Sequence, residues 1–359
     1  MKRRLFIKEL GLLTTAFCLT PDEASAALFG KSRKKQFKGF NLLNKFNPDF
    51  QSPFNEKDFE IMSEWGFNFA RIPLSYWCWS KQDDWQYINE EILKEIDRVV
   101  EFGKSYRIHI NLNFHRAPGY CINPPHEKAN LFEDRAALEA CAFHWRLFAE
   151  RYKSYKSKYL SFNLINEAPS IPDEKYDKVV QHLIKSIREV SPERTIFVDG
   201  LDVGNRPLMT LTQEKNIIQS GRGYQPMLIS HYGANWVYGD NPMYFPKENL
   251  SWPLKENGRT YDKEWLRSTL NKNWEPWMQQ GGKVHIGEFG CHNRTPHDTA
   301  LKWMEDLLSI FDENRWGWSL WNLHGSFGVL DSDRRDVKYE SYKGHKLDRK
   351  MLELLLRHK

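Results

Sequence analysis

Residues 161–170 read SFNLINEAPS, an apolar run that ends in an amide and a carboxylate, Asn166 and Glu167, and then meets Pro169. Polar residues are common where a strand leaves the core, and proline is a frequent stop signal, so this stretch predicts a buried strand and its exit. Taken alone, the Asn166–Glu167 pair is compatible with a solvated strand end. Its interpretation depends on whether other strands of the chain end in the same way.

Short apolar runs rich in β-branched residues recur along the chain, each followed by a segment with helical character. The eight runs cover residues 36–43, 68–74, 107–115, 160–167, 195–200, 228–233, 283–290 and 317–323. Near-continuous apolar strands that alternate with helices indicate a parallel sheet covered by helices on its outside. Eight such units predict a single α/β domain, a (β/α)8 TIM barrel, whose usual size is about 250 residues plus insertions.

Three connections after predicted strands are long. They follow the second, third and sixth strands and cover residues 77–85, 116–128 and 234–254. In a barrel, these loops lie at the C-terminal face of the sheet, where barrel enzymes have their active sites. The fifth unit is the weakest, because residues 201–211 are short and broken by Pro207. With no Gly/Ser linker or low-complexity tract, residues 27–359 are expected to form one domain.

The first 26 residues have the composition of an export signal. Arg3–Arg4 precede a modest apolar stretch at 10–19, and small residues follow at 24–26. The paired arginines are typical of the twin-arginine route, which predicts cleavage after Ala26 and export to the periplasm or beyond. A bilayer span needs about 20 apolar residues, so this stretch is too short to be a membrane anchor.

Composition excludes several classes of protein. The formal net charge of +5 over 359 residues is too small to indicate a nucleic-acid-binding protein. Four cysteines remain after the expected cleavage, Cys78, Cys121, Cys141 and Cys291, and they lack the close paired spacing of a zinc site. A single Cys78–Cys121 disulfide stays open. We therefore expect no metal and no cofactor, whereas 14 Trp and 15 Tyr favour binding by flat side chains or a large aromatic core.

Polar and aromatic side chains gather at the predicted strand ends. Besides Asn166 and Glu167, they are Arg71, His115, His231, Tyr232, Glu288 and Trp321. Any one of these residues could be structural, but eight at the same rim of a barrel indicate a functional site. The fourth and seventh strands lie roughly across the barrel, so Glu167 and Glu288 are expected to face each other over its mouth.

Two facing carboxylates in different environments suit a glycosidase, which needs one protonated acid and one anion. Arg71 and Tyr232 are plausible partners of Glu288, and a cation with a hydroxyl donor would keep it ionised. Glu167 is expected near His231 with no obvious cation, so its pKa can rise. Trp321 would form a flat floor on which a sugar ring stacks.

As a set, these motifs resemble glycoside hydrolase family 5, the cellulase-type barrels, over essentially all of residues 36–357. The motifs are Arg-x-Pro at 71–73, His115, Asn166–Glu167, His231–Tyr232, Glu288 in IGEFG and Trp321 in LWNL. The resemblance implies a retaining hydrolase in which Glu167 is the acid/base and Glu288 the nucleophile.

The resemblance also implies roles for the surrounding residues. Asn166 would bind the 2-hydroxyl of the sugar in subsite −1, and His115 a neighbouring hydroxyl. Arg71 and Tyr232 would position the nucleophile, and His231 would position the acid/base.

The expected activity is that of an exported, monomeric endo-β-1,4-glucanase acting on a β-linked oligo- or polysaccharide. Residues 114–125, FHRAPGYCINPP, differ from the His-His or Trp-His sequence of many bacterial endoglucanases, and their APG is similar to the exo-β-1,3-glucanase branch. A β-1,3-glucanase and a β-mannanase are therefore alternatives. A catalytically silent carbohydrate-binding barrel would usually have lost one glutamate. A metal-dependent hydrolase would need a closer cluster of His and Asp.

Overall fold

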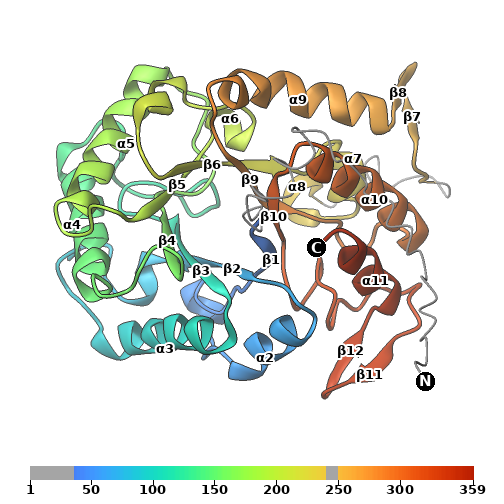
Figure 1. Ribbon diagram of the computed structural model, residues 1–359, viewed down its shortest axis with the longest axis horizontal. Coiled ribbons are helices and arrows are strands. Elements are labelled where there is room, and N and C mark those ends of the chain that lie inside the picture. The colour runs from blue at the N-terminus through green and yellow to red at the C-terminus, as the bar shows by residue number, and fades with distance from the viewer. Residues whose placement is uncertain (1–35, 240–249) are drawn as a thin grey trace, which may run out of the picture. The chain divides into compact units, whose positions relative to one another are not determined.

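The computed structural model describes residues 36–239 and 250–359, and the expected signal peptide lies outside them. Eight parallel strands of this part form a closed barrel in the order β1-β10-β9-β6-β5-β4-β3-β2 (Figure 1). They are β1 (Lys38–Asn41), β2 (Phe69–Ser75), β3 (His109–Arg116), β4 (Leu160–Asn163), β5 (Thr195–Asp199), β6 (Ile217–Gly223), β9 (Val284–Phe289) and β10 (Gly317–Leu320). The predicted TIM barrel is confirmed.

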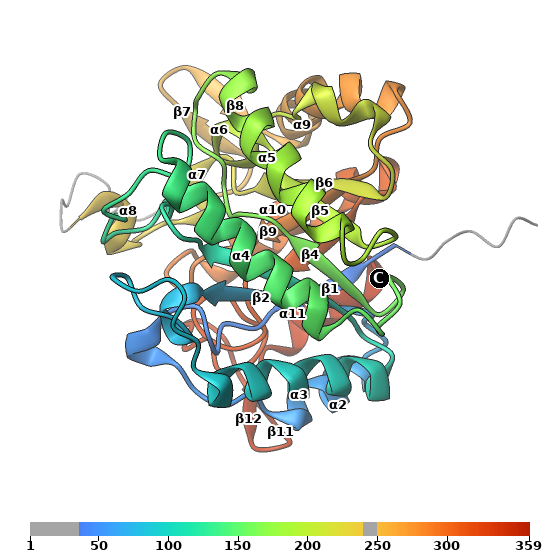
Figure 2. The same ribbon diagram turned by 90° about the vertical axis from the view of Figure 1, so that its left-hand side faces the viewer.

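Helices cover the outside of the barrel. The longer ones are α2 (Glu56–Glu64), α3 (Glu90–Tyr106), α4 (Arg135–Arg151), α5 (Asp173–Arg188), α9 (Lys263–Gln279), α10 (His297–Glu313) and α11 (Arg349–Arg357). Figure 2 shows α4 between α3 and α5 on one side of the barrel. Arg151 of α4 binds Asp97 of α3 through Nε to Oδ1 at 2.6 Å. No helix of the described residues is long and apolar enough to cross a membrane.

The helix α3 illustrates how sequence produces these elements. Asn89 caps it by accepting the backbone N–H of Glu91, which satisfies one of the free donors at a helix start. Apolar residues recur at helical spacing and are buried, namely Leu93, Ile96, Val99 and Val100. Because these residues share one face, the helix packs that face on the barrel and leaves its charged face in water.

Short elements connect several of the strands and helices. They are α6 (Leu201–Gly204), α7 (Met227–Ser230), α8 (Asn235–Tyr238) and the 3-10 turns η1 (Pro48–Phe50), η2 (Tyr76–Cys78) and η3 (Met209–Gln213). Two hairpins pair β7 (Leu254–Glu256) with β8 (Arg259–Tyr261), and β11 (Glu340–Tyr342) with β12 (His345–Leu347). The weak fifth unit is indeed only the single turn α6 and η3.

The interior of the barrel has two chemically different layers. Toward the strand starts, aromatic rings fill it: the ring of Phe69 stacks on His109 at 5.7 Å between centroids and lies 4.6 Å from His285. One layer further along, Arg71 replaces the aromatic ring and donates to Asn41 Oδ1 at 3.0 Å and Asn163 Oδ1 at 3.1 Å. The aromatic lower layer supports a polar upper layer that opens toward the C-terminal face.

The predicted sixth strand at 228–233 was wrong. Those residues fall in α7 and the turn that follows, and the sixth barrel strand is β6, where Ile217 pairs with Ile196 and Arg222 with Glu288. The segment IIQSGRG escaped prediction because its later residues are polar or glycine. A barrel interior that is polar at this height accepts such a strand, and an apolar-run criterion does not find it.

The cysteines of the described part are buried free thiols, so no Cys78–Cys121 disulfide is present. Cys78 Sγ lies 3.4 Å from the carbonyl oxygen of Lys45, and Cys121 Sγ lies 3.6 Å from that of His115. Each thiol thus contacts a backbone acceptor of its own neighbourhood.

Candidate active site

A cavity of about 710 Å³ opens at the C-terminal ends of the strands. Its polar floor contains Glu167 and Glu288, and its walls include the aromatic residues Phe46, Tyr224, Trp236, Trp321 and Phe327. A concave, partly apolar surface with a few converging polar groups is the usual form of a ligand site. The two carboxylates that the sequence predicted to face each other thus line one cavity.

Glu288, near the end of β9, is held by cations and a hydroxyl group. Its Oε1 accepts from Arg71 Nη1 at 2.7 Å and lies 3.3 Å from Arg222 Nη2, while its Oε2 accepts from the hydroxyl of Tyr224 at 3.2 Å. Burial, and then the Glu288 charge, raises the pKa of Tyr224 well above its usual value, so the phenol keeps its proton and remains a donor. Two cations and one hydroxyl therefore fix both oxygens of this carboxylate.

The main chain of Glu167 is fixed by two hydrogen bonds, one to its N–H and one to its carbonyl oxygen. Its N–H donates to Asp199 Oδ2 at 2.8 Å, and its carbonyl accepts from the hydroxyl of Tyr120 at 2.6 Å. Its φ of 50° lies in the left-handed region, which is uncommon for a residue with a side chain and is found often at functional sites. These bonds fix where the side chain enters the cavity.

The Glu167 carboxyl is in a different electrostatic environment from Glu288. Burial raises the pKa of Glu167 to about 7 and the nearby Glu288 charge adds to this, whereas the Arg222 guanidinium, which donates from Nε at 3.0 Å, opposes it. Glu167 can therefore carry a proton near neutral pH while Glu288 is held by cations. This is the asymmetry that a glycosidase pair needs.

Asn166 has a fixed amide orientation. Its Oδ1 accepts from Arg71 Nη2 at 2.8 Å and from Arg222 Nη2 at 2.7 Å, so its Nδ2 donor is turned toward His115 Nε2 at 3.4 Å. Burial lowers the pKa of His115 well below its usual value, with the Arg71 charge adding to it, so the ring is neutral. A neutral imidazole and an oriented amide are suited to binding hydroxyl groups.

Residues 29–326 match the family model of cellulase, glycosyl hydrolase family 5. The chain belongs to this family. Endoglucanase C of Acetivibrio thermocellus is 28% identical over 312 residues, which cover 81% of this chain and 90% of the relative. A crystal structure of a glycoside hydrolase is 38% identical and superimposes with a TM-score of 0.83, covering 90% of this chain and 99% of that one.

Endoglucanase Cel5A of Thermotoga maritima shares the fold, at 24% identity and a TM-score of 0.72 over 89% of this chain and 96% of that one. The family 5 membership makes this protein a glycoside hydrolase of the retaining type. Retention requires a nucleophile and an acid/base that face each other, which matches a cavity lined by two carboxylates in different environments.

Two predicted residues of the hydrolase lie elsewhere than expected. His231 lies just after α7 and lines the cavity, but it contacts the ring of Tyr224 at 4.8 Å between centroids. Tyr232 lies beyond it, where its carbonyl accepts from His292 Nδ1 at 3.0 Å. The expectation that Tyr232 donates to Glu288 was wrong; Tyr224 does so, because β6 ends at Gly223.

The expectation that Glu167 has no nearby cation was also wrong, because Arg222 binds it. Arg222, Tyr224 and Asp199 are the residues that sequence reasoning missed. Asp199 ends β5 at the rim where the other site residues were found, so the strand-end criterion could have found it. Arg222 and Tyr224 carried no such signal once the sixth strand had been misplaced.

Trp321 lies directly after β10, at the predicted rim, but it forms part of the cavity wall and not the floor. It lines the cavity, and its ring stacks near His115 at 5.6 Å between centroids with an interplanar angle of 26°. Phe46 contacts the same indole edge-on at 5.7 Å. The indole is thereby held in place as one wall of the cavity.

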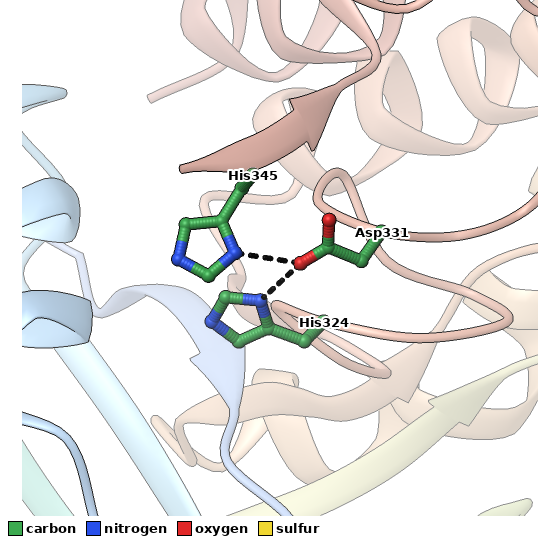
Figure 3. A group of neighbouring side chains, drawn as sticks. All are labelled: His324, Asp331 and His345. Atoms are coloured by element: carbon green, nitrogen blue, oxygen red, sulfur yellow. Dashed lines mark hydrogen bonds and ion pairs between the residues drawn. The ribbon is translucent and has the colours of Figure 1, made fainter. Parts of the chain in front are cut away.

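In the described residues, the side chains that could together hold a metal ion are His324, Asp331 and His345 (Figure 3). Their contacts account for them without an ion: Asp331 Oδ2 accepts from His345 Nδ1 at 2.6 Å and lies 3.3 Å from His324 Nδ1. His324 Nε2 lies 2.8 Å from Asp58 Oδ1 of α2. The group joins the loop after β10 to β12 and α2, and none of its members lines the cavity.

This group makes stability depend on pH. Burial alone would lower the pKa of His324, but its hydrogen bonds to Asp58 and Asp331 outweigh burial and raise that pKa. A raised folded-state pKa means that protonation of His324 stabilises the fold. The contribution is complete below the unfolded pKa of about 6.5 and is lost as the pH rises through the folded value.

Proposed function

We propose that this hydrolase is an endo-β-1,4-glucanase, with Glu167 as its acid/base and Glu288 as its nucleophile. The observation that carries the assignment is the unequal environment of the two carboxyls in one cavity: Glu288 is held by Arg71, whereas burial raises the pKa of Glu167 to about 7. The similarity to endoglucanase C supports the substrate class.

In the first step, a Glu288 oxygen attacks the anomeric carbon of the sugar and forms an ester bond to it. The bond from that carbon to the leaving oxygen breaks, and the oxygen takes the proton of Glu167. In the second step, Glu167 takes a proton from water as the water oxygen attacks the same carbon. The ester bond then breaks and Glu288 is a carboxylate again, with two inversions giving net retention.

The remaining residues of the cavity orient the sugar. The Nδ2 of Asn166, whose amide is fixed by two arginines, would donate to the 2-hydroxyl of the sugar in subsite −1. His115 would bind a neighbouring hydroxyl, and Trp321 would stack against the ring. Trp236 is 62% exposed and lines the same cavity, so it offers a further stacking surface for a longer chain.

The test is hydrolysis of a panel of β-1,4-glucan, β-1,3-glucan, mixed-linkage glucan, xyloglucan and mannan by wild type and by Glu167→Gln and Glu288→Gln. We expect internal cleavage of β-1,4-glucan to oligosaccharides, loss of this activity in both variants, and wild-type activity in the matched control Glu313→Gln, which changes an exposed ion pair with Arg267. Preferential cleavage of β-1,3-glucan or mannan would overturn the substrate, and binding without cleavage of any glucan would leave a silent barrel.

We further propose that the enzyme is exported as a monomer after removal of residues 1–26, on the strength of Arg3–Arg4 and the small residues at 24–26. N-terminal sequencing of the exported protein should give Ala27 first, and light scattering should give the mass of one chain. An exported protein that still begins with Met1 would contradict the processing, and a mass of two chains would contradict the monomer.

A further inference from the structure

Arg222 touches more of the reacting machinery than any role assigned so far explains. Its Nε donates to Glu167 Oε1 at 3.0 Å, and its Nη2 lies 3.3 Å from Glu288 Oε1. The same Nη2 binds Asp199 Oδ2 and donates to Asn166 Oδ1 at 2.7 Å. One guanidinium thus contacts both carboxylates of the reaction.

The charge of the site moves during the reaction, but its sum does not change. The proposed roles require that, in the reactive free enzyme, Glu288 is the anion and Glu167 carries the proton. In the glycosyl-enzyme Glu288 is an uncharged ester and Glu167 has become the anion. With Arg71, Arg222 and the carboxylate of Asp199 unchanged, one negative charge has passed from one glutamate to the other.

Of the two glutamate side chains, Arg71 hydrogen-bonds to Glu288, whereas the hydrogen bond to the Glu167 carboxylate comes from Arg222. Arg222 is within contact distance of both glutamates, because it extends from β6 between the ends of β4 and β9. We propose that Arg222 is a positioning residue that serves as the shared counterion of the two glutamates, orienting Glu288 for attack in the first step and the Glu167 anion for activating water in the second. The inference rests on the proposed roles of these glutamates.

Asp199 holds the guanidinium in place. It is fully buried, binds Arg222 through one oxygen, accepts from Asn163 Nδ2 at 2.9 Å through the other, and also accepts the main-chain N–H of Glu167. Burial alone would raise the pKa of Asp199, but the guanidinium groups of Arg222 and Arg71, together with its hydrogen bonds, outweigh burial and lower that pKa, so Asp199 is an anion. The same carboxylate therefore fixes the counterion and the backbone of the acid/base.

Two glycines leave room for this arrangement. A Cβ on Gly287 would lie 3.0 Å from Arg222 Nη1, and a Cβ on Gly204 would lie 2.8 Å from its Cγ. Hydrogen bonds from Arg222 Nη1 to Ser220 Oγ at 3.2 Å and to the Gly221 carbonyl at 3.1 Å further restrain the side chain. A fixed cation avoids reorganisation at the moment of reaction, which is the main advantage of a preorganised site.

The test separates the two steps with an aryl β-cellobioside that has a good leaving group. For such a substrate kcat/KM reports formation of the glycosyl-enzyme, and kcat reports its hydrolysis, provided that a pre-steady-state burst of the phenol is seen. The variants are Arg222→Met and Arg222→Lys. Arg194→Met is the matched control, because Arg194 is also buried but binds the carbonyls of Leu160 and Tyr152 at the opposite end of the barrel.

We expect Arg222→Met to lower both kcat/KM and kcat by about 10²-fold, the usual loss for one preorganised donor. Removing a cation raises the pKa of each neighbouring carboxyl. With a cello-oligosaccharide, which needs the proton of Glu167, both limbs of the kcat/KM profile should therefore move to higher pH. Arg222→Lys keeps the charge but not the planar fork, so we expect smaller losses in both constants and limbs near those of wild type. Arg194→Met should leave both limbs where they are.

A loss in only one of the two constants would overturn the shared role. Equal losses in both constants with an unchanged pH profile would also overturn it, because Arg222 would then have only a structural role. If Arg222→Met does not fold by circular dichroism, Arg222→Lys decides: a fall in both constants supports the inference, and a fall in one or neither overturns it. These failures differ from failure of the proposed function, in which wild type itself would cleave neither the aryl glycoside nor any β-glucan.

Discussion

The alkaline limb of the pH–rate profile should depend on the leaving group of the substrate. Since burial raises the pKa of Glu167 to about 7, this carboxyl is half protonated at neutral pH. By the ordinary titration relation, about nine-tenths of the enzyme carries the proton at pH 6 and about one-tenth at pH 8. A substrate that needs proton donation should therefore lose about tenfold in kcat/KM over this range.

The assay compares two substrates on the same enzyme. A cello-oligosaccharide has an alcohol as its leaving group and needs the proton of Glu167, whereas an activated aryl β-glycoside releases a phenolate that needs none. We expect kcat/KM for the oligosaccharide to fall between pH 6 and 8 and kcat/KM for the aryl glycoside to change little. Circular dichroism at each pH, and recovery of activity on return to pH 6, control for loss of structure.

Equal losses for the two substrates would refute the reasoning, because the limb would then not report proton donation. If the alkaline limb for the oligosaccharide had its midpoint at about pH 4.3, the ordinary pKa of a glutamate, burial would not raise the pKa of Glu167 in solution. In that case the acid would have to be sought elsewhere in the cavity.

Four further outcomes are expected. With an activated aryl β-glycoside and azide, Glu167→Ala should give the β-glycosyl azide, because azide attacks the glycosyl-enzyme intermediate. Glu288→Ala should give the α-glycosyl azide, because azide attacks the substrate directly. If each variant gave the other product, the roles of the two glutamates would be reversed. Arg71→Ala should lower kcat by about 10² or more, since it orients the nucleophile, whereas a rise in KM alone would make it a substrate-binding residue. A crystal structure should place the carboxyl groups of Glu167 and Glu288 about 5 to 5.5 Å apart, and more than about 6.5 Å would speak against a retaining pair. The thermal midpoint of His324→Ala should fall furthest below wild type under about pH 6.5 and approach it in alkali; a difference independent of pH would show that protonation of His324 does not stabilise the fold.

Most of the barrel could be predicted because most of its strands are buried on both faces. Such strands read as continuous apolar runs, as in β2, where all of Phe69–Ser75 is buried. The strand β6 could not be found in this way, because Ser220 and Arg222 point toward the polar upper layer, where they hydrogen-bond to each other. Its local sequence reflects the chemistry of the site and not the packing of a core.

The strand-end criterion found Arg71, Asn166, Glu167 and Glu288, because the geometry of a parallel barrel brings all strand ends to one rim. It failed for Tyr232, whose position depended on a misplaced strand. The criterion also did not identify Phe327, which lies in the loop after β10 and lines the cavity. Such loops are positioned by tertiary contacts that the local sequence does not specify.

The division of the barrel interior has a consequence for how this enzyme can be altered. The aromatic layer around Phe69 and His285 lies below the polar layer of Arg71, so the two sets of residues need not share contacts with substrate. Substitutions in well-separated positions usually have additive effects, so heat tolerance can be selected in the lower layer and substrate preference in the rim loops in independent libraries. A variant whose rim loops are altered to bind a different polysaccharide would keep the same aromatic layer beneath them.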